Sequence, residues 1–223
     1  MKQRSLLFSP SLLAGDFAAA STGTDKIAAA GADYVHLDVM DGCYVQSITF
    51  GSKMIADLRK KSDLVFDVHL MVMNPERHIR EMAEAGANII SVHPESTHHI
   101  WRCVDAIKDF GCEAGLALNP GTSVPFVESM LRIIDYIIVM GVHPGAGAQP
   151  FIKEMLRKIE ELDRRREENG YHYLIAVDGG VSKKTIKSCW QAGMDVAIMG
   201  SAFFGASDPA LFLEECREIA ESE

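Results

Sequence analysis

Short apolar runs alternate with longer amphipathic segments along nearly the whole chain. The apolar runs have the length of buried strands, and the amphipathic segments have the spacing of helices with one apolar face. The predicted helices include 75–87, 150–170 and 183–194, and endings such as AGA and AGM supply a glycine for the helix C-terminus. The predicted strands lie at residues 6–12, 34–39, 64–70, 88–93, 113–118, 136–141, 173–178 and 196–200.

Strands that alternate with helices predict right-handed βαβ units and therefore a parallel sheet. Eight strand–helix pairs predict closure into an α/β fold of the (β/α)8, or TIM, barrel type, with residues 1–223 as a single domain. An open doubly wound sheet is the alternative. The G-x-G-x-x-G turn that a dinucleotide-binding sheet carries after its first strand does not occur in this sequence.

Charge, cysteine spacing and the N-terminal residues indicate which partners and which compartment to expect. The formal net charge of -9 supplies no basic face, which argues against nucleic acid and anionic membranes as partners. The five cysteines are widely spaced and form no C-x-x-C pair, as is usual in a reducing compartment. Pro10 and Asp16 interrupt the apolar run near the N-terminus, which disfavours a signal peptide. We therefore expect a cytoplasmic protein.

Titratable side chains gather at the predicted C-terminal ends of three strands, which is the end where TIM barrels place their active sites. His36 and Asp38 alternate on the second strand, His69 follows Asp67 on the third, and Asp178 ends the seventh. Two imidazoles and two carboxylates suit one divalent cation, such as Zn, Fe, Mn or Co. Asp67 is expected to be a buried structural carboxylate or a partner that contacts a ligating histidine from behind.

Three stretches of small residues follow the last three strands, namely HPGAGAQPF (143–151), DGGVS (178–182) and MGSAFFG (199–205). Small residues let backbone N–H groups approach an anion, and helix N-termini favour negative charge. No lysine or arginine lies within these stretches, so they predict a phosphate site built mainly from backbone N–H groups. Met40, Met71 and Met140 lie on or just past strands, where they either pack in the core or line a polarizable pocket over a delocalised anion.

Nine ordered motifs carry a resemblance to a known family: SPSLLAGDF (9–17), ADYVHLDVMDG (32–42), SITFG (47–51), DVHLMV (67–72), ISVHPE (90–95), GLALNPGTSV (115–124), IIVMGVHPGAGAQPFI (137–152), VDGGVS (177–182) and MGSAFF (199–204). With them the chain resembles the ribulose-phosphate 3-epimerase family along essentially its whole length. The resemblance implies a TIM barrel that holds one divalent cation and forms a homo-oligomer.

The resemblance also implies roles for individual residues. His36, Asp38, His69 and Asp178 would hold the cation, and Asp38 and Asp178 would be the acid/base pair on opposite faces of the substrate carbon. Ser11 would hydrogen-bond near the reacting hydroxyls. The phosphate would lie on Gly145, Ala146, Gly147, Ala148, Gly179, Gly180, Gly200 and Ser201, and Met40, Met71, Met140 and His69 would face the rest of the substrate.

This set implies epimerisation at C3 of a ketose phosphate through a 2,3-enediolate, by default D-ribulose 5-phosphate to D-xylulose 5-phosphate. A base removes the C3 proton, a bound cation stabilises the negative charge on the oxygens, and a second acid returns a proton to the other face. Inversion without turning the substrate over requires one acid/base group on each face, which explains a pair of aspartates.

The sequence departs from the family pattern around the expected substrate. Residues 45–47 read Val-Gln-Ser where V-P-N is usual, and the phosphate loop has Ala146 and Ala148 where P-G-F-G-G-Q is usual. His143 and Gly141 are also unusual. None of these changes touches the inferred cation ligands, so the reaction class is retained and the substrate is left open.

Three alternatives stand beside this default reaction, and the first two follow from these departures. A smaller side chain at Ala146 leaves room for another sugar phosphate, such as D-allulose 6-phosphate. A catalytically silent sugar-phosphate-binding homologue is the non-enzymatic alternative. A Schiff-base aldolase would need a lysine on a barrel strand, whereas the lysines of this chain fall in predicted helices or loops.

Overall fold

The computed structural model describes residues 4–222 and has eight parallel strands in one sheet. The strands pair in the order β1-β8-β7-β6-β5-β4-β3-β2. Their bounds are β1 Leu7–Pro10, β2 Tyr34–Met40, β3 Val65–Met71, β4 Ile89–Val92, β5 Glu113–Leu118, β6 Tyr136–Met140, β7 Leu174–Asp178 and β8 Val196–Met199.

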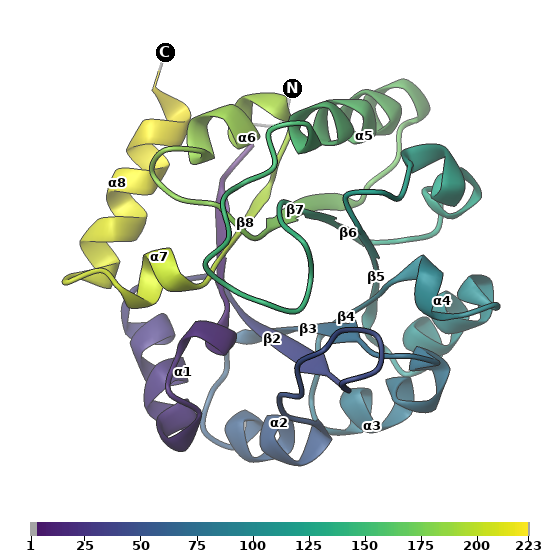
Figure 1. Ribbon diagram of the computed structural model, residues 1–223, viewed down its shortest axis with the longest axis horizontal. Helices are drawn as coiled ribbons and strands as arrows, with labels where there is room; N and C mark the ends of the chain where they lie inside the picture. The colour runs from purple at the N-terminus through teal and green to yellow at the C-terminus, as the bar shows by residue number, and fades with distance from the viewer. Residues whose placement is uncertain (1–3, 223) are drawn as a thin grey trace.

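The barrel closes between its first two strands. A parallel bridge between Ser11 and His36 joins the end of β1 to β2, and the remaining neighbours form continuous ladders. Helices surround the strands in a ring (Figure 1). The predicted (β/α)8 barrel is confirmed, and the open doubly wound sheet is excluded.

Helices follow seven of the eight strands within the described chain. The connection between β5 and β6 instead contains the 3-10 helix Val124–Met130, so the prediction of eight α-helical units is wrong at this position. Pro125 lies in the first turn of this 3-10 helix, where the missing N–H group of proline is tolerated. The α-helices are α1 Ala20–Ala29, α2 Ser52–Arg59, α3 Ile79–Glu84, α4 Ile100–Asp109, α5 Met155–Asn169, α6 Ile186–Ala192, α7 Ser201–Phe204 and α8 Pro209–Glu221.

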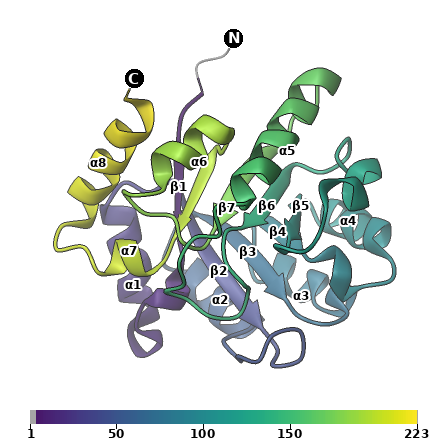
Figure 2. The same cartoon turned by 45° about the horizontal axis from the view of Figure 1, so that its top comes forward.

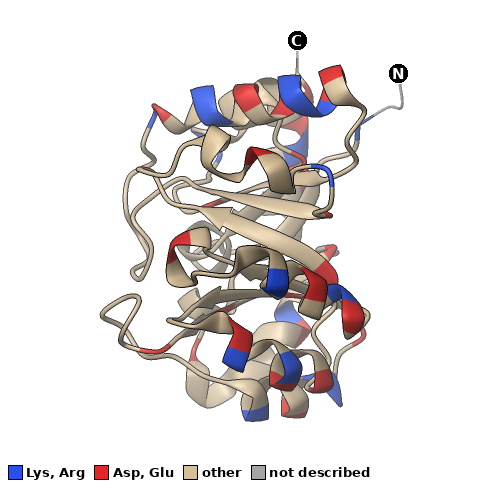
Figure 3. Cartoon of the chain, turned by 90° about the vertical axis from the view of Figure 1, so that its right-hand side faces the viewer, with Lys and Arg blue, Asp and Glu red and all other residues tan. Residues whose placement is uncertain are grey.

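Alternation along the strands divides the apolar residues between two cores. Tyr136, Ile138, Val196 and Ile198 belong to a buried cluster inside the barrel, and a larger cluster fills the space between strands and helices. Charged residues lie mainly on the outer helices and connecting loops (Figure 3). Across residues 4–222, no helix has the length and apolar character that a membrane crossing requires.

The long connections gather at the C-terminal ends of the strands. The green segment between β6 and α5 crosses the opening of the barrel in Figure 1, and the same loop is seen from another angle in Figure 2. Ser47, in the connection after β2, donates a hydrogen bond of 2.7 Å to the backbone carbonyl of Gly145 in this loop. The two segments therefore meet over the barrel, and they are the segments in which the sequence departs from the family pattern.

Candidate active site and metal centre

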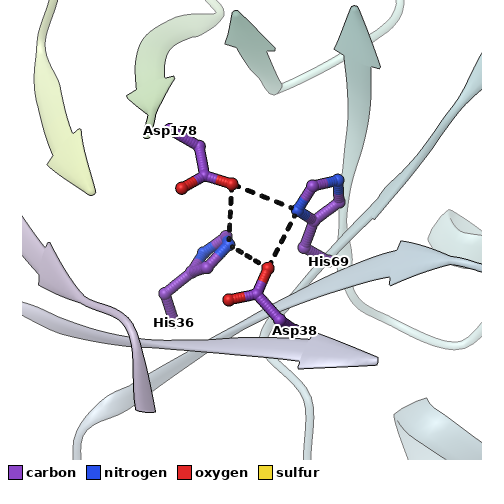
Figure 4. Close-up of side chains that lie close together, drawn as sticks. All are labelled: His36, Asp38, His69 and Asp178. Atoms are coloured by element: carbon purple, nitrogen blue, oxygen red, sulfur yellow. Dashed lines mark ion pairs between the residues drawn. The ribbon is translucent and has the colours of Figure 1, made fainter. Parts of the chain in front are cut away.

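His36, Asp38, His69 and Asp178 converge at the C-terminal end of the barrel (Figure 4). One nitrogen or oxygen atom of each lies within 4.8 Å of the others. Asp38 Oδ1 is 3.3 Å from His36 Nε2 and 3.3 Å from His69 Nδ1. Asp178 Oδ2 is 3.5 Å from His69 Nδ1 and 3.8 Å from His36 Nε2. The structure thus brings together all four side chains that the sequence proposed as cation ligands.

Strand register explains how the four side chains meet. His36 and Asp38 are two residues apart on β2 and so point to the same side of the sheet. Asp38 lies opposite His69 on the neighbouring strand β3. Asp178 ends β7 and enters the cluster from the side opposite Asp38 (Figure 4).

The donor atoms fit a divalent cation. His36 Nε2 and His69 Nδ1 are buried, have no hydrogen-bond partner among the described residues, and face the carboxylate oxygens of Asp38 and Asp178. Buried polar atoms without partners are costly, and a cation would satisfy both nitrogens and both carboxylates at once. Two imidazole nitrogens with two carboxylate oxygens are a common ligand set for Zn, Fe, Mn and Co.

Electrostatics in the cluster favour positive charge. Burial lowers the pKa of His36, but attraction to Asp67 and Asp38 outweighs it and raises the pKa well above its ordinary value. Burial likewise opposes ionisation of Asp38, whose pKa is nevertheless held below its usual range by His36 and His69. The pKa of His69 is also raised, because its contacts with the carboxylates of Asp178 and Asp38 outweigh its burial. Protons and a metal cation therefore compete for the same centre.

Asp67 supports His36 from the side away from the cluster. Its Oδ2 atom lies 2.7 Å from His36 Nδ1 and accepts hydrogen bonds of 3.1 Å from Ser9 Oγ and 3.1 Å from the Tyr136 hydroxyl. Burial and the charge of Asp67 raise the pKa of Tyr136 well above its ordinary value, so this hydroxyl stays a donor. The prediction that Asp67 contacts a histidine from behind is confirmed.

His93 is a site residue that the sequence reasoning missed. It follows β4, is fully buried, and its Nε2 atom lies 2.9 Å from His69 Nε2. Burial, followed by the charge of His69, lowers the pKa of His93 well below its ordinary value, so its ring is neutral. Its position at the end of the predicted strand 88–93 is the same signal that identified His36 and His69.

A cavity of about 910 Å³ opens beside Asp38 and Asp178, which both line it. Ser11 donates a hydrogen bond of 2.6 Å to Asp38 Oδ2, which holds this carboxylate in place. His36 and His69 are fully buried. The other predicted substrate residues all line the cavity, namely Ser11, Met40, Met71, Met140, Gly145, Ala146, Gly147, Ala148, Gly179, Gly180, Gly200 and Ser201.

The small-residue loops form one part of this lining. Gly180 has φ +73°, and a Cβ atom there would lie 2.7 Å from Phe151 Cα, so only glycine fits. Gln149 donates hydrogen bonds of 2.7 Å each to the carbonyls of His143 and Ala146, which folds the loop back on itself. Lys184 also lines the cavity. The sequence reasoning missed this cation because Lys184 lies two residues beyond the stretch 178–182.

Ala148 has a left-handed backbone, with φ +58°, at the position where the family usually has glycine. A left-handed conformation costs a residue with a Cβ atom roughly 1–2 kcal/mol, and glycine adopts it without this penalty. The loop over the cavity therefore contains backbone strain at Ala148.

Replacing Ala148 with glycine should raise the free energy of unfolding by about 0.5–1 kcal/mol, because the relief of strain exceeds the added chain entropy of glycine. Urea unfolding would measure the gain. Ala146→Gly is the matched control, since Ala146 lies in the same loop and has no positive φ. Stabilisation by both substitutions, or by neither, would contradict the assignment of strain to residue 148.

Comparisons with known proteins agree with this geometry. The ribulose-phosphate 3 epimerase family matches residues 7–204. A ribulose-phosphate 3-epimerase of Bacillus subtilis is 42% identical over 209 residues, which cover 93% of this chain and 96% of the relative. A ribulose-phosphate 3-epimerase of Aquifex aeolicus is 41% identical over 202 residues, which cover 91% of each chain.

A solved structure with much lower sequence identity shares the fold. The 3-keto-L-gulonate-6-phosphate decarboxylase of Vibrio cholerae has a TM-score of 0.72 at 15% identity, over 98% of each chain. This likeness shows a shared barrel and nothing about the reaction. The family match and the two relatives, by contrast, extend over most of the sequence. The chain therefore belongs to the ribulose-phosphate 3-epimerase family.

Proposed function

We propose that the protein is a metal-dependent 3-epimerase of a ketose phosphate, with D-ribulose 5-phosphate and D-xylulose 5-phosphate as the default pair. The relatives carry the name of this reaction, and the family is one of isomerases, as expected from the sequence. A homo-oligomer in the cytoplasm is part of the proposal.

The observation that carries the proposal is the placement of Asp38 and Asp178. They come from strands β2 and β7, enter the cluster from opposite sides, and both line the cavity (Figure 4). Inversion at one carbon requires a proton to leave from one face and another to arrive at the opposite face. Two carboxylates that approach one point from opposite sides and line the same cavity are suited to this pair of transfers.

The chain's own residues would perform the proton transfers. One of Asp38 and Asp178 accepts the C3 proton, and the other donates a proton to the opposite face of the planar 2,3-enediolate. Ser11 keeps Asp38 oriented through its 2.6 Å hydrogen bond. The cation held by His36, Asp38, His69 and Asp178 would supply Lewis-acid stabilisation of negative charge.

The remaining lining residues would bind the rest of the substrate. Met40, Met71 and Met140 give the cavity polarizable apolar walls beside the carboxylates. The small-residue loops and the start of α7 at Ser201 present backbone N–H groups to the phosphate. Lys184 adds a positive charge beside these loops.

One observation favours a second substrate. Ala146 is exposed and lines the cavity at a position where the family usually has a bulky aromatic residue. The space this leaves supports a longer ketose phosphate, such as D-allulose 6-phosphate. A Schiff-base aldolase is not supported, since none of the eight described strands carries a lysine.

A panel of ketose phosphates with four to six carbons, incubated in D2O with metals added back, tests the proposal. Proton NMR should show solvent exchange at C3 together with epimerisation, and the preferred chain length assigns the substrate. Tight binding without exchange would contradict the proposal and favour a silent binding protein. A covalent adduct after borohydride treatment would contradict it in favour of an aldolase.

A further inference from the structure

The two histidines of the cluster contact different partners on the side away from the cluster. His36 contacts the carboxylate of Asp67, at 2.7 Å from Nδ1. His69 contacts a second imidazole, with its Nε2 atom 2.9 Å from His93 Nε2. A contact between two ring nitrogens at this distance requires that one carry the proton and the other accept it. The direction of that bond decides which nitrogen of His69 is free to face the cluster.

The position of the other His69 nitrogen fixes the direction of the bond. His69 Nδ1 faces Asp38 Oδ1 at 3.3 Å and Asp178 Oδ2 at 3.5 Å. A cation held there needs this nitrogen without its proton, so the proton of the His69 ring belongs on Nε2. His93 Nε2 is then the acceptor, and His93 Nδ1 has no hydrogen-bond partner among the described residues.

We infer that His93 is a positioning residue of the centre: its Nε2 atom accepts the proton of His69 Nε2 and so directs the bare Nδ1 atom of His69 at Asp38 and Asp178. The opposite tautomer would place the proton of His69 between Nδ1 and the two carboxylates, where it blocks a cation. This inference rests on the proposed function, because the cation is what requires a bare His69 Nδ1.

Packing holds the His93 ring in the required orientation. The Tyr44 ring lies over it, with centroids 4.7 Å apart and an interplanar angle of 34°. The Tyr44 hydroxyl accepts a hydrogen bond of 2.6 Å from Asn119 Nδ2, which anchors Tyr44 to the connection after β5. Tyr44 lies in the connection after β2, next to the departing segment 45–47. The connection after β2 thus contacts the cluster indirectly, because Tyr44 packs on His93 and His93 contacts His69.

His93→Gln and His93→Leu form an informative pair. Glutamine offers an amide oxygen as an acceptor near the position of Nε2, and leucine offers no acceptor. Ser91→Ala is the matched control, because Ser91 is buried on β4 just before His93, lies opposite His69 in the register, and has a hydroxyl with no partner among the described residues.

The first measurement is the tautomer of His69, from nitrogen-15 NMR of the metal-free protein at alkaline pH. The parent, His93→Gln and Ser91→Ala should show a proton on Nε2. His93→Leu should move this proton to Nδ1 or give a mixture. A parent protein with the proton on Nδ1, or a tautomer unchanged in His93→Leu, would overturn the inference. A role in packing alone would not move the tautomer.

The second measurement is Zn²⁺ affinity, from competition with a chromophoric chelator. His93→Leu should bind about 10–100-fold more weakly, as is usual when the partner behind a ligating histidine is lost, and the other two variants should stay within about threefold of the parent. Equal affinity in His93→Leu would overturn the inference. A parent that binds no Zn²⁺ but shows the expected, His93-dependent tautomer would support the positioning role and contradict the metal in the proposed function. If the leucine variant does not fold, the tautomers of the parent and of His93→Gln decide.

Discussion

Asp38→Asn and Asp178→Asn should each lower the rate of epimerisation by a factor of about 10³ or more. General acid–base catalysis contributes roughly 10²–10⁴-fold, and each aspartate is also a proposed cation ligand. Asparagine keeps the shape of the side chain and removes its ability to take up a proton. The rates would be measured by NMR in D2O with D-ribulose 5-phosphate and with D-xylulose 5-phosphate.

The two variants should also differ from each other in isotope exchange. Each keeps one carboxylate, so any residual C3–H exchange should be confined to one epimer in Asp38→Asn and to the other epimer in Asp178→Asn. Asp105→Asn, on the exposed face of α4, controls for the substitution itself. Residual exchange of the same epimer in both variants would indicate a single base. Epimerisation within tenfold of the parent in both would refute the assigned roles.

Much of the barrel was predictable because its determinants are local. Apolar runs of strand length, separated by amphipathic segments, report burial on two faces of a parallel sheet, and this pattern is readable without tertiary contacts. The connection between β5 and β6 was not predictable in this way. It contains the 3-10 helix Val124–Met130 and no α-helix among its described residues, so the count of units was right and the type of one element was wrong.

The cluster was predictable because parallel strands end at the same side of a barrel. His36, Asp38, His69 and Asp178 each lie at a strand end, and topology alone brings such positions together. His93 lies at a strand end as well. Its relevance depends on a ring-to-ring contact with His69, which alternation along a strand does not specify.

The loops over the cavity depend on contacts that are distant in sequence. The bond from Ser47 to the carbonyl of Gly145 joins positions 98 residues apart. The left-handed φ of Ala148 is imposed by the path of its loop, since alanine has no local preference for it. The sequence showed that these positions depart from the family pattern, and only the structure shows that the two departing segments touch.

Removing the cation should abolish both C3–H exchange and epimerisation, and about one equivalent of a divalent metal should restore them. The cation would hold the two carboxylates and the two unpaired nitrogens in one arrangement, and no other positive group among the described residues contacts all four. Binding to the folded state alone also adds stability, by about 2.7 kcal/mol at a hundredfold excess over Kd. For a chain of this length this is roughly 5–10 °C in Tm. Dialysis against a chelator, metal analysis and thermal unfolding would measure the three effects.

The increase in Tm that the metal produces should become larger as pH rises. Burial lowers the pKa of His36 in the metal-free protein, but Asp67 and Asp38 outweigh it and raise the pKa well above its unfolded value. A raised folded-state pKa stabilises the protein fully below the unfolded pKa, and this contribution is lost as pH rises through the folded value. The free energy of unfolding of the metal-free protein should therefore fall at alkaline pH. In the metal-loaded protein the cation takes the place of the His36 proton, so this loss should not occur. His36→Gln, which removes the titrating ring, should flatten this dependence. A metal-induced gain in Tm that stays constant or shrinks as pH rises would show that the cation binds away from His36.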